Sequence, residues 1–215
     1  MQKLTEYDCR VLLSKYKIKL PRAELARSED EAVKYAEKIG YPVVLKLISA
    51  DMLHKTDAGG VIINIDDAEG VRKAYGKIHS NARAHGNICV DGILVEETLC
   101  GRQVIVGSVR DPQFGPVLMF GIGGIFVELL HDVSFRVIPI TRRDAEKMIQ
   151  EIKAHDILSG VRGQKGVNRR ALVDTLVKVS NMVEKEREIV ELDINPLFVN
   201  EKEAVAGDAR IVMSK

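Results

Sequence analysis

The sequence predicts an α+β protein in which helices cover largely antiparallel sheets. Helix-like and strand-like patterns alternate along the 215 residues, and the middle of the chain is rich in strand candidates. A hydrophobic fraction of 46% and a charged fraction of 29% are typical of a soluble globular protein. The length suits one large domain or two small ones.

Polar residues at helix starts support this assignment. Thr5 is suited to cap a first helix, and Ser28 with Glu31 forms a capping box for a second helix that ends at Gly40. Later helices are predicted from Asp66 or Asp67 to about Ala84, over 141–152 and over 170–186. The predicted strands cover 43–48, 61–65, 92–96, 103–107, 116–120, 135–140, 189–199 and 204–213.

Charge and cysteine usage exclude several classes of protein. The net charge of +1 shows no basic or acidic excess of the kind that binds nucleic acid or a membrane surface. No apolar run approaches the roughly 18 residues of a membrane-spanning helix. Three scattered cysteines, without CxxC spacing, argue against a disulfide framework and a zinc site. We therefore expect a cytoplasmic protein that binds neither nucleic acid nor a membrane.

Lys46 interrupts the apolar strand over 43–48. A buried ammonium group needs a counter-charge, and the phosphates of a nucleotide would supply one. The alternative is an edge-strand lysine that faces water.

The loop over 54–61 contains His54 and the glycine pair Gly59 and Gly60 directly before a strand. Paired glycines let backbone amides approach a phosphate closely, and imidazole accepts phosphoryl groups as a nucleophile. The alternative is a surface loop with an incidental histidine.

The two last strands are predicted to form a hairpin. A turn centred between Glu201 and Lys202 pairs Asn195 with Asp208, and strand alternation puts Asp193 on the same face as Asn195. These hard oxygen donors suit Mg²⁺. The alternative is a solvated polar face, and a bulge at Gly207 would shift the pairing.

Several segments, in this order and spacing, resemble the ATP-grasp subunit of the ADP-forming acetyl-CoA synthetases, which are relatives of succinyl-CoA synthetase. The similarity covers nearly the whole chain. The segments that carry it are 44–46, 54–61, 111–117, 121–128, 192–197 and 208–211.

The resemblance implies an ATP-grasp fold of two α/β subdomains with the nucleotide between them. Residues 20–95 would form a small lid-like subdomain, and residues 1–19 with 96–215 a larger subdomain that binds nucleotide and Mg²⁺. The family converts acyl-CoA, ADP and phosphate into free acid, CoA and ATP, with a phosphoryl group carried on histidine. Its CoA-binding domains and principal phosphohistidine lie in another polypeptide or a fused segment, which implies a partner alpha subunit in an α2β2 assembly.

The resemblance also implies roles for residues near the nucleotide. Lys46 matches the lysine on the phosphates, with Gly59 and Gly60 nearby. The hinge beside the adenine and ribose matches Glu96, Glu97, Thr98 and Leu99.

Three further residues match the family's metal site: Asn195 and Asp208 match the Mg²⁺ ligands, and Asp193 the adjacent carboxylate. His54 matches a histidine proposed to be a second phosphoryl carrier, which succinyl-CoA synthetase lacks. Two places depart from the pattern: Gln103 stands where a glutamate is expected, and the stretch 163–166 lacks an expected proline, with no clear consequence. Gln103 keeps hydrogen-bonding capacity but not the negative charge.

Two other functions are compatible with the residues. A stand-alone ATP-grasp carboxylate ligase would need an acceptor pocket within this chain. A non-catalytic nucleotide-binding regulatory module would be consistent with Gln103 but not with intact Lys46, His54, Asn195 and Asp208.

Overall fold

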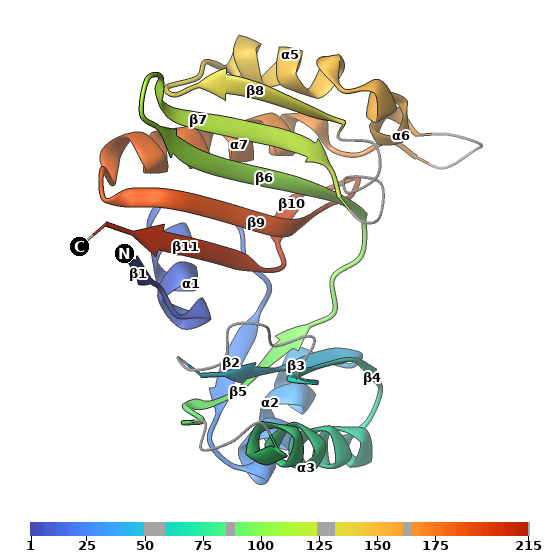
Figure 1. Cartoon of the computed structure of the whole chain (residues 1–215). Coiled ribbons are helices and arrows are strands. Elements are labelled where there is room, and N and C mark those ends of the chain that lie inside the picture. The colour runs from blue at the N-terminus through green and yellow to red at the C-terminus, as the bar shows by residue number, and fades with distance from the viewer. Residues whose placement is uncertain (50–58, 85–88, 124–131, 161–164, 215) are drawn as a thin grey trace. The chain divides into compact units, whose positions relative to one another are not determined.

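The computed structural model describes residues 1–49, 59–84, 89–123, 132–160 and 165–214 (Figure 1). His54 and the rest of its loop, residues 50–58, therefore lie outside the described residues. The chain divides into a larger unit, Met1–Leu20 with Leu99–Lys215, and a smaller unit, Pro21–Thr98. Glu96, Glu97 and Thr98 belong to the smaller unit, and Leu99 begins the second part of the larger one.

The larger unit is built on a seven-stranded antiparallel sheet. The strand order is β1-β11-β9-β6-β7-β8, and β10 also pairs with β9. The strands are β1 (Gln2–Lys3), β6 (Arg102–Asp111), β7 (Gly115–Ile122), β8 (Val133–Val137), β9 (Ile189–Val199), β10 (Ala204–Ala206) and β11 (Ala209–Met213).

Helices pack against one face of this sheet. They are α1 (Glu6–Lys15), α5 (Arg142–Glu151), the 3-10 turn η1 (Lys153–His155), α6 (Asp156–Ser159) and α7 (Arg169–Lys185). Leu118 and Leu192 of the sheet join Leu172 and Leu176 of α7 in the core between the layers. In Figure 1 this unit is viewed from the opposite sheet face, which carries no helix among the described residues. Within those residues, none of the helices is long and apolar enough to cross a membrane.

The smaller unit has its own sheet and core. Its antiparallel strands run in the order β2-β5-β3-β4. The elements are β2 (Ala23–Ala26), α2 (Glu29–Ile39), β3 (Val43–Ile48), β4 (Val61–Ile65), α3 (Ala68–Ala84) and β5 (Gly92–Glu97). Ala36 of α2 and Ile78 of α3 pack against buried strand residues such as Leu45 and Val95. The two antiparallel sheets with packed helices confirm the predicted α+β class.

The predicted helix caps are present, with one difference. The Thr5 hydroxyl accepts a hydrogen bond from the Asp8 amide at 3.1 Å, and the Ser28 hydroxyl accepts one from the Glu31 amide at 3.2 Å. The Glu31 carboxylate, however, accepts from the amide of Arg27 at 2.8 Å, so the box predicted at Ser28 closes one residue earlier.

Several strand predictions differ from the structure in their bounds. The strands expected over 103–107 and 116–120 are longer, as Arg102–Asp111 and Gly115–Ile122. The strand expected over 135–140 is β8, which ends at Val137, because Pro139 has no amide hydrogen to continue a ladder. The final strand is divided into β10 and β11 around Gly207 and Asp208. A Cβ at Gly207 would lie 2.7 Å from the Phe198 ring, so only glycine fits the tight path of the chain there.

Candidate functional site

Lys46 lies on an interior strand of the smaller unit. Strand β3 is paired on one side with β5 and on the other with β4, so the alternative of an edge-strand lysine is wrong. Its Nζ lies 2.7 Å from Oε2 of Glu96, and the two side chains are 12% and 3% exposed. Antiparallel pairing sets this contact, because Val44 lies opposite Glu96 and Lys46 lies two residues further on the same face of β3.

This ion pair changes the argument for Lys46. The carboxylate of Glu96 supplies a counter-charge, so the buried ammonium does not by itself require a nucleotide phosphate. The resemblance implied a place for Glu96 beside the adenine and ribose. It did not predict that the Glu96 carboxylate contacts Lys46. Glu96 is recognisable in the sequence as an acidic residue on an apolar strand. Its pairing with Lys46 follows only from the register of β3 with β5.

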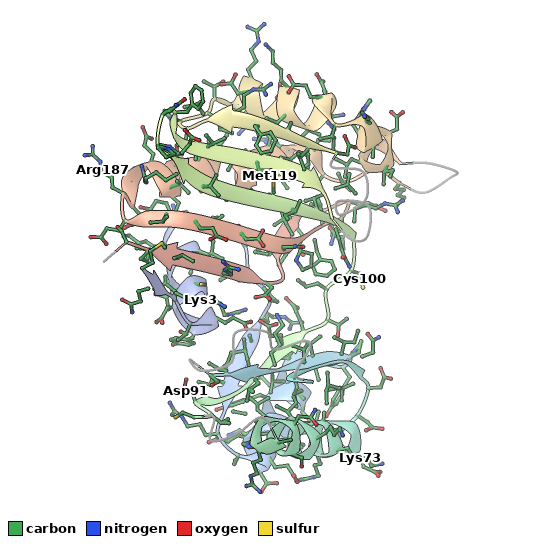
Figure 2. All side chains as sticks on the ribbon, viewed as in Figure 1. Lys3, Lys73, Asp91, Cys100, Met119 and Arg187 are labelled. Carbon is green, nitrogen blue, oxygen red and sulfur yellow. The ribbon has the colours of Figure 1, made fainter. Side chains whose placement is uncertain are left out.

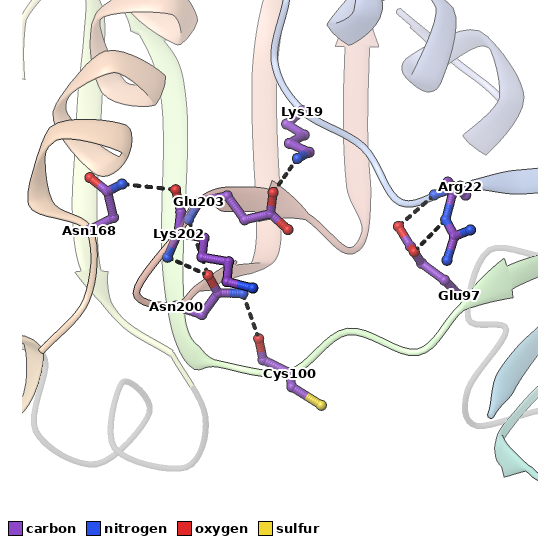
Figure 3. A network of polar contacts seen from close by, with 8 residues as sticks. All are labelled: Lys19, Arg22, Glu97, Cys100, Asn168, Asn200, Lys202 and Glu203. Atoms are coloured by element: carbon purple, nitrogen blue, oxygen red, sulfur yellow. Dashed lines mark hydrogen bonds and ion pairs between the residues drawn. The ribbon is translucent and has the colours of Figure 1, made fainter. Parts of the chain in front are cut away.

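Glu97, the last residue of β5, is held by an arginine. Both carboxylate oxygens of Glu97 accept hydrogen bonds from Arg22, one from its amide at 2.9 Å and one from Nε at 2.7 Å (Figure 3). The Glu97 amide donates to the Arg22 carbonyl at 3.0 Å. This contact was not predicted, because 75 residues separate the two partners.

The other two hinge residues differ in their surroundings. The Thr98 amide donates to the carbonyl of Pro42 at 3.3 Å. Its hydroxyl oxygen is buried and has no hydrogen-bond partner within the described part of the chain. Leu99 is half-buried.

The backbone carbonyls of Gly59 and Gly60 both accept hydrogen bonds within the smaller unit. Gly59 has φ = +63°, and a Cβ there would lie 2.4 Å from the side-chain nitrogen of Asn81. That nitrogen donates to the Gly59 carbonyl at 2.8 Å. The Gly60 carbonyl accepts from the Leu47 amide at 2.8 Å, which anchors the end of the loop beside Lys46. Asn81 was not identified from the sequence, where it is one of several polar residues on α3.

In the larger unit, the predicted hairpin register is confirmed. Leu197 pairs with Ala206 and Ile194 with Ala209, so Asn195 and Asp208 lie opposite each other. The Asn195 amide donates to the Asp208 carbonyl at 3.2 Å. The break between β10 and β11 leaves the same register on both sides of Gly207, so the shift that a bulge would cause does not occur.

The turn of this hairpin is held by two asparagines. The side-chain oxygen of Asn200 accepts from the amides of Lys202 and Glu203 at 2.8 and 3.1 Å (Figure 3). Asn168, the N-cap of α7, donates from its side chain to the Lys202 carbonyl at 2.8 Å and from its amide to the Asn200 carbonyl at 2.7 Å. These bonds fix the turn, and the turn fixes which residues of the two strands face each other.

The donor set of the hairpin fits a divalent cation. Leu192 and Ile194 are buried in the core, so Asp193 and Asn195 lie on the opposite face of β9. The described residues include no cluster of three His, Cys, Asp or Glu side chains, and this set has two carboxylates and one amide oxygen. Such a set suits Mg²⁺, which takes its remaining ligands from water and substrate phosphates.

Electrostatics support the same fit. Burial raises the pKa of Asp193 above its usual value, and the nearby charges of Asp208 and Glu191 raise it further, while Arg210 acts in the opposite direction. Arg210 itself donates to Glu191 at 2.9 Å. A bound cation would offset the cost of keeping Asp193 ionised in this environment.

Gln103 is the second residue of β6 and lies next to Gly123, which follows β7. It lies opposite Phe198 on β9 and is exposed. Its carbonyl accepts from the Gly123 amide at 2.8 Å, and a Cβ at Gly123 would lie 2.9 Å from the Gln103 backbone. The backbone contact is independent of the side chain, so a glutamine in place of glutamate preserves it.

Comparisons with known proteins agree on one family. The ATP-grasp domain family matches residues 1–213. The chain is 51% identical over 212 residues to the acetate–CoA ligase (ADP-forming) I subunit beta of Pyrococcus furiosus, covering 98% of this chain and 91% of that one. It is 45% identical to acetate–CoA ligase (ADP-forming) II of Archaeoglobus fulgidus, covering 99% of this chain but 30% of that longer protein.

Solved structures give the same result. The acetyl-CoA synthetase 1 of Ca. Korarchaeum cryptofilum, in complex with coenzyme A and Ca-AMPCP, superimposes with a TM-score of 0.95 at 44% identity, over 99% of this chain and 93% of that one. Another structure of that protein, with Mg-AMPPCP and a phosphohistidine segment pointing towards the nucleotide-binding site, has a TM-score of 0.87 at 42% identity and the same coverage.

Proposed function

The chain belongs to the ATP-grasp family and, within it, to the beta subunits of the ADP-forming acetate–CoA ligases, and from this premise we propose that it is the nucleotide-binding, phosphoryl-transferring subunit of an acyl-CoA synthetase. Such an acid–thiol ligase converts acyl-CoA, ADP and phosphate into free acid, CoA and ATP. The observation that carries the proposal is the hairpin register that sets Asn195 opposite Asp208, with Asp193 on the same face as Asn195.

In the proposed site the larger unit holds the metal. Asp193, Asn195 and Asp208 would bind Mg²⁺, which when bound offsets charge on the phosphate oxygens of the nucleotide. The cost of ionising half-buried Asp193 supports this role, because a cation on the carboxylate lowers that cost.

The smaller unit would contribute the positive charge of Lys46 to the nucleotide phosphates. The 2.7 Å contact with Glu96 holds the ammonium in place before a substrate arrives. Arg22 would hold the hinge carboxylate Glu97 beside the adenine and ribose in the same way.

The reaction of this subunit would be transfer of a phosphoryl group from histidine to ADP. A nitrogen–phosphorus bond of phosphohistidine breaks, and a bond forms between that phosphorus and a terminal oxygen of ADP. The partner alpha subunit would supply the principal phosphohistidine and the CoA-binding domains, in an α2β2 assembly. His54 would receive the group and pass it to ADP. The name "subunit beta" of the relative and the phosphohistidine segment in the Korarchaeum structure support this arrangement.

The decisive experiment is ATP formation from acetyl-CoA, ADP and phosphate by the chain together with a purified partner chain that carries the CoA-binding domains. We expect ATP only when both chains are present. ATP-dependent ligation of an amine by the isolated chain would instead indicate a stand-alone carboxylate ligase. Nucleotide binding with no ATP formation by the pair would indicate a regulatory module.

The metal site has a separate test. Asp208→Ala is expected to weaken Mg-ADP binding at least about 10-fold in calorimetry, the scale of one lost charge-assisted contact. Asp156→Ala is the control, because Asp156 is an exposed aspartate on α6 of the same unit. Equal Mg-ADP affinity for both variants and the unaltered chain would show that the hairpin does not bind the metal.

A further inference from the structure

The glycine pair before β4 is held between a helix and a strand of the smaller unit. The side-chain nitrogen of Asn81 on α3 donates to the Gly59 carbonyl at 2.8 Å. The Leu47 amide on β3 donates to the Gly60 carbonyl at 2.8 Å. Both carbonyl directions are therefore fixed, one toward the helix and the other toward the neighbouring strand.

The two faces of the four-stranded sheet carry different side chains. Leu45 and Leu47 face the helices, because they belong to the same core as Ile78 of α3. In Figure 1 both helices of this unit, α2 and α3, lie on one side of the sheet. Strand alternation puts Lys46 on the other face, where its ammonium group contacts Glu96.

The direction of the Gly60 amide follows from that of the Gly59 carbonyl. The two groups belong to one planar trans peptide, so the carbonyl oxygen and the amide hydrogen point in opposite directions. Because Asn81 holds the Gly59 carbonyl toward α3, the Gly60 amide points away from the helix, to the sheet face that carries Lys46. The next residue, Val61, pairs directly with Lys46 across β3 and β4, so this amide lies beside the lysine.

Within the part of the chain that the structure describes, the Gly60 amide donates no hydrogen bond. Gly60 is nevertheless buried. A buried backbone amide without an acceptor is rare and costly, so it indicates an acceptor that the chain itself does not supply. Beside Lys46 a phosphate oxygen meets this need, since backbone amides and an ammonium group both bind phosphate.

We propose that Asn81 is a positioning residue for the nucleotide phosphates: by holding the Gly59 carbonyl, it directs the Gly60 amide to a phosphate oxygen beside Lys46. This inference rests on the proposed function and adds a residue to its phosphate site. Asn81 acts through the backbone and does not contact the nucleotide. The same contact requires glycine at position 59, because a Cβ there would lie 2.4 Å from the Asn81 nitrogen.

The nucleotide affinity of the full chain tests this role. Asn81→Ala is expected to raise the Kd of Mg-ADP about 10-fold, the scale of one lost contact to a charged group. The Kd of adenosine should change less than about twofold, since adenosine has no phosphate. A contact that only stabilises the fold would lower the melting temperature without changing the ratio of the two affinities.

Two variants serve as controls. Asn181→Ala removes an exposed asparagine from α7, which has 17 residues like α3. Lys73→Ala changes a residue of α3 itself, labelled in Figure 2, whose side chain is 74% exposed and pairs with Glu69. Both controls should bind Mg-ADP and adenosine as the unaltered chain does.

Nuclear magnetic resonance of the ¹⁵N-labelled chain observes the amide directly. Inorganic pyrophosphate should shift the Gly60 amide proton of the unaltered chain downfield, because the proton enters a new hydrogen bond. The same addition should leave this signal in place in Asn81→Ala. If Asn81→Ala does not fold, Asn81→Leu replaces it, since leucine has a similar shape and no donor.

Three results would overturn the proposal. The first is an Mg-ADP Kd for Asn81→Ala, or its Asn81→Leu substitute, equal to that of the unaltered chain. The second is an equal loss of ADP and adenosine affinity. The third is a Gly60 amide signal of the unaltered chain that pyrophosphate does not move.

The proposed function and the role of Asn81 fail in different ways. If the unaltered chain binds neither Mg-ADP nor Mg-ATP, the proposed function is wrong and the role of Asn81 is wrong with it. If the unaltered chain binds Mg-ADP and forms ATP with its partner, while Asn81→Ala binds Mg-ADP equally well, only the role of Asn81 is wrong.

Discussion

Substitution of Glu96 tests how much the buried Lys46–Glu96 ion pair contributes to the stability of the smaller unit. Its carboxylate lies 2.7 Å from Lys46 Nζ, and both side chains are almost excluded from water. Deleting one partner of a buried ion pair costs about 3–5 kcal/mol, because a charge stays buried without its counter-charge. We therefore expect Glu96→Ala to destabilise the smaller unit by at least about 3 kcal/mol.

Hydrogen exchange measures this effect in the unit concerned. A loss of about 3 kcal/mol corresponds to roughly 100-fold faster exchange of amides that open with the whole unit. Peptides that cover Val43–Ile48 and Gly92–Glu97 should show it, and peptides from β6 and β9 of the larger unit should not. The double variant Lys46→Met with Glu96→Gln should recover most of the protection, because no charge is then buried alone.

An exposed ion pair in the same unit provides the control. Lys38 Nζ lies 2.6 Å from Glu24 Oε1, a distance similar to that of the buried pair, but the two side chains are 68% and 40% exposed. Glu24→Ala should cost less than about 1 kcal/mol. Equal exchange rates for Glu96→Ala and Glu24→Ala would refute the reasoning from burial.

Three further predictions concern His54, Asp193 and the thiols. In the assembled complex, His54→Ala should slow ATP formation at least about 10²-fold at unchanged ADP affinity; full turnover would exclude His54 as a carrier. Burial raises the pKa of Asp193, so its ionised form lowers stability at neutral pH, and that cost disappears as the pH falls through the raised pKa. Without Mg²⁺, Asp193→Asn should thus raise the melting temperature at neutral pH. This gain should vanish below pH 3.8, the usual pKa of an aspartate. A lower melting temperature of the variant at neutral pH would contradict the prediction. Burial raises the pKa of Cys9 to about 11, so iodoacetamide at about pH 8 should modify Cys89 and Cys100 about 100-fold faster, and equal labelling would contradict this.

Much of the fold was predictable because its signals are local. A hydroxyl at Thr5 or Ser28 bonds to an amide three residues away, so a capped helix can be identified from a few neighbouring residues. The hairpin register was predictable for the same reason: Asn200 bonds to the amides of Lys202 and Glu203, and a short turn determines the pairing of its strands. The apolar run over 135–140 suggested a longer strand, but Pro139 has no amide hydrogen to continue the ladder, and β8 ends at Val137.

Residues that are distant in the sequence required the tertiary structure. Lys46 was identified as unusual from its apolar neighbours, but its partner Glu96 is selected by the pairing of β3 with β5. Arg22 and Glu97, and Asn81 and Gly59, meet only after the smaller unit has folded. The cross-strand row Arg210, Asp193, Gly107, Met119 and Phe135 likewise depends on five strands being in register. Local chemistry thus specified the elements and the candidate groups, whereas their partners depend on long-range strand pairing, which brings distant residues within contact distance.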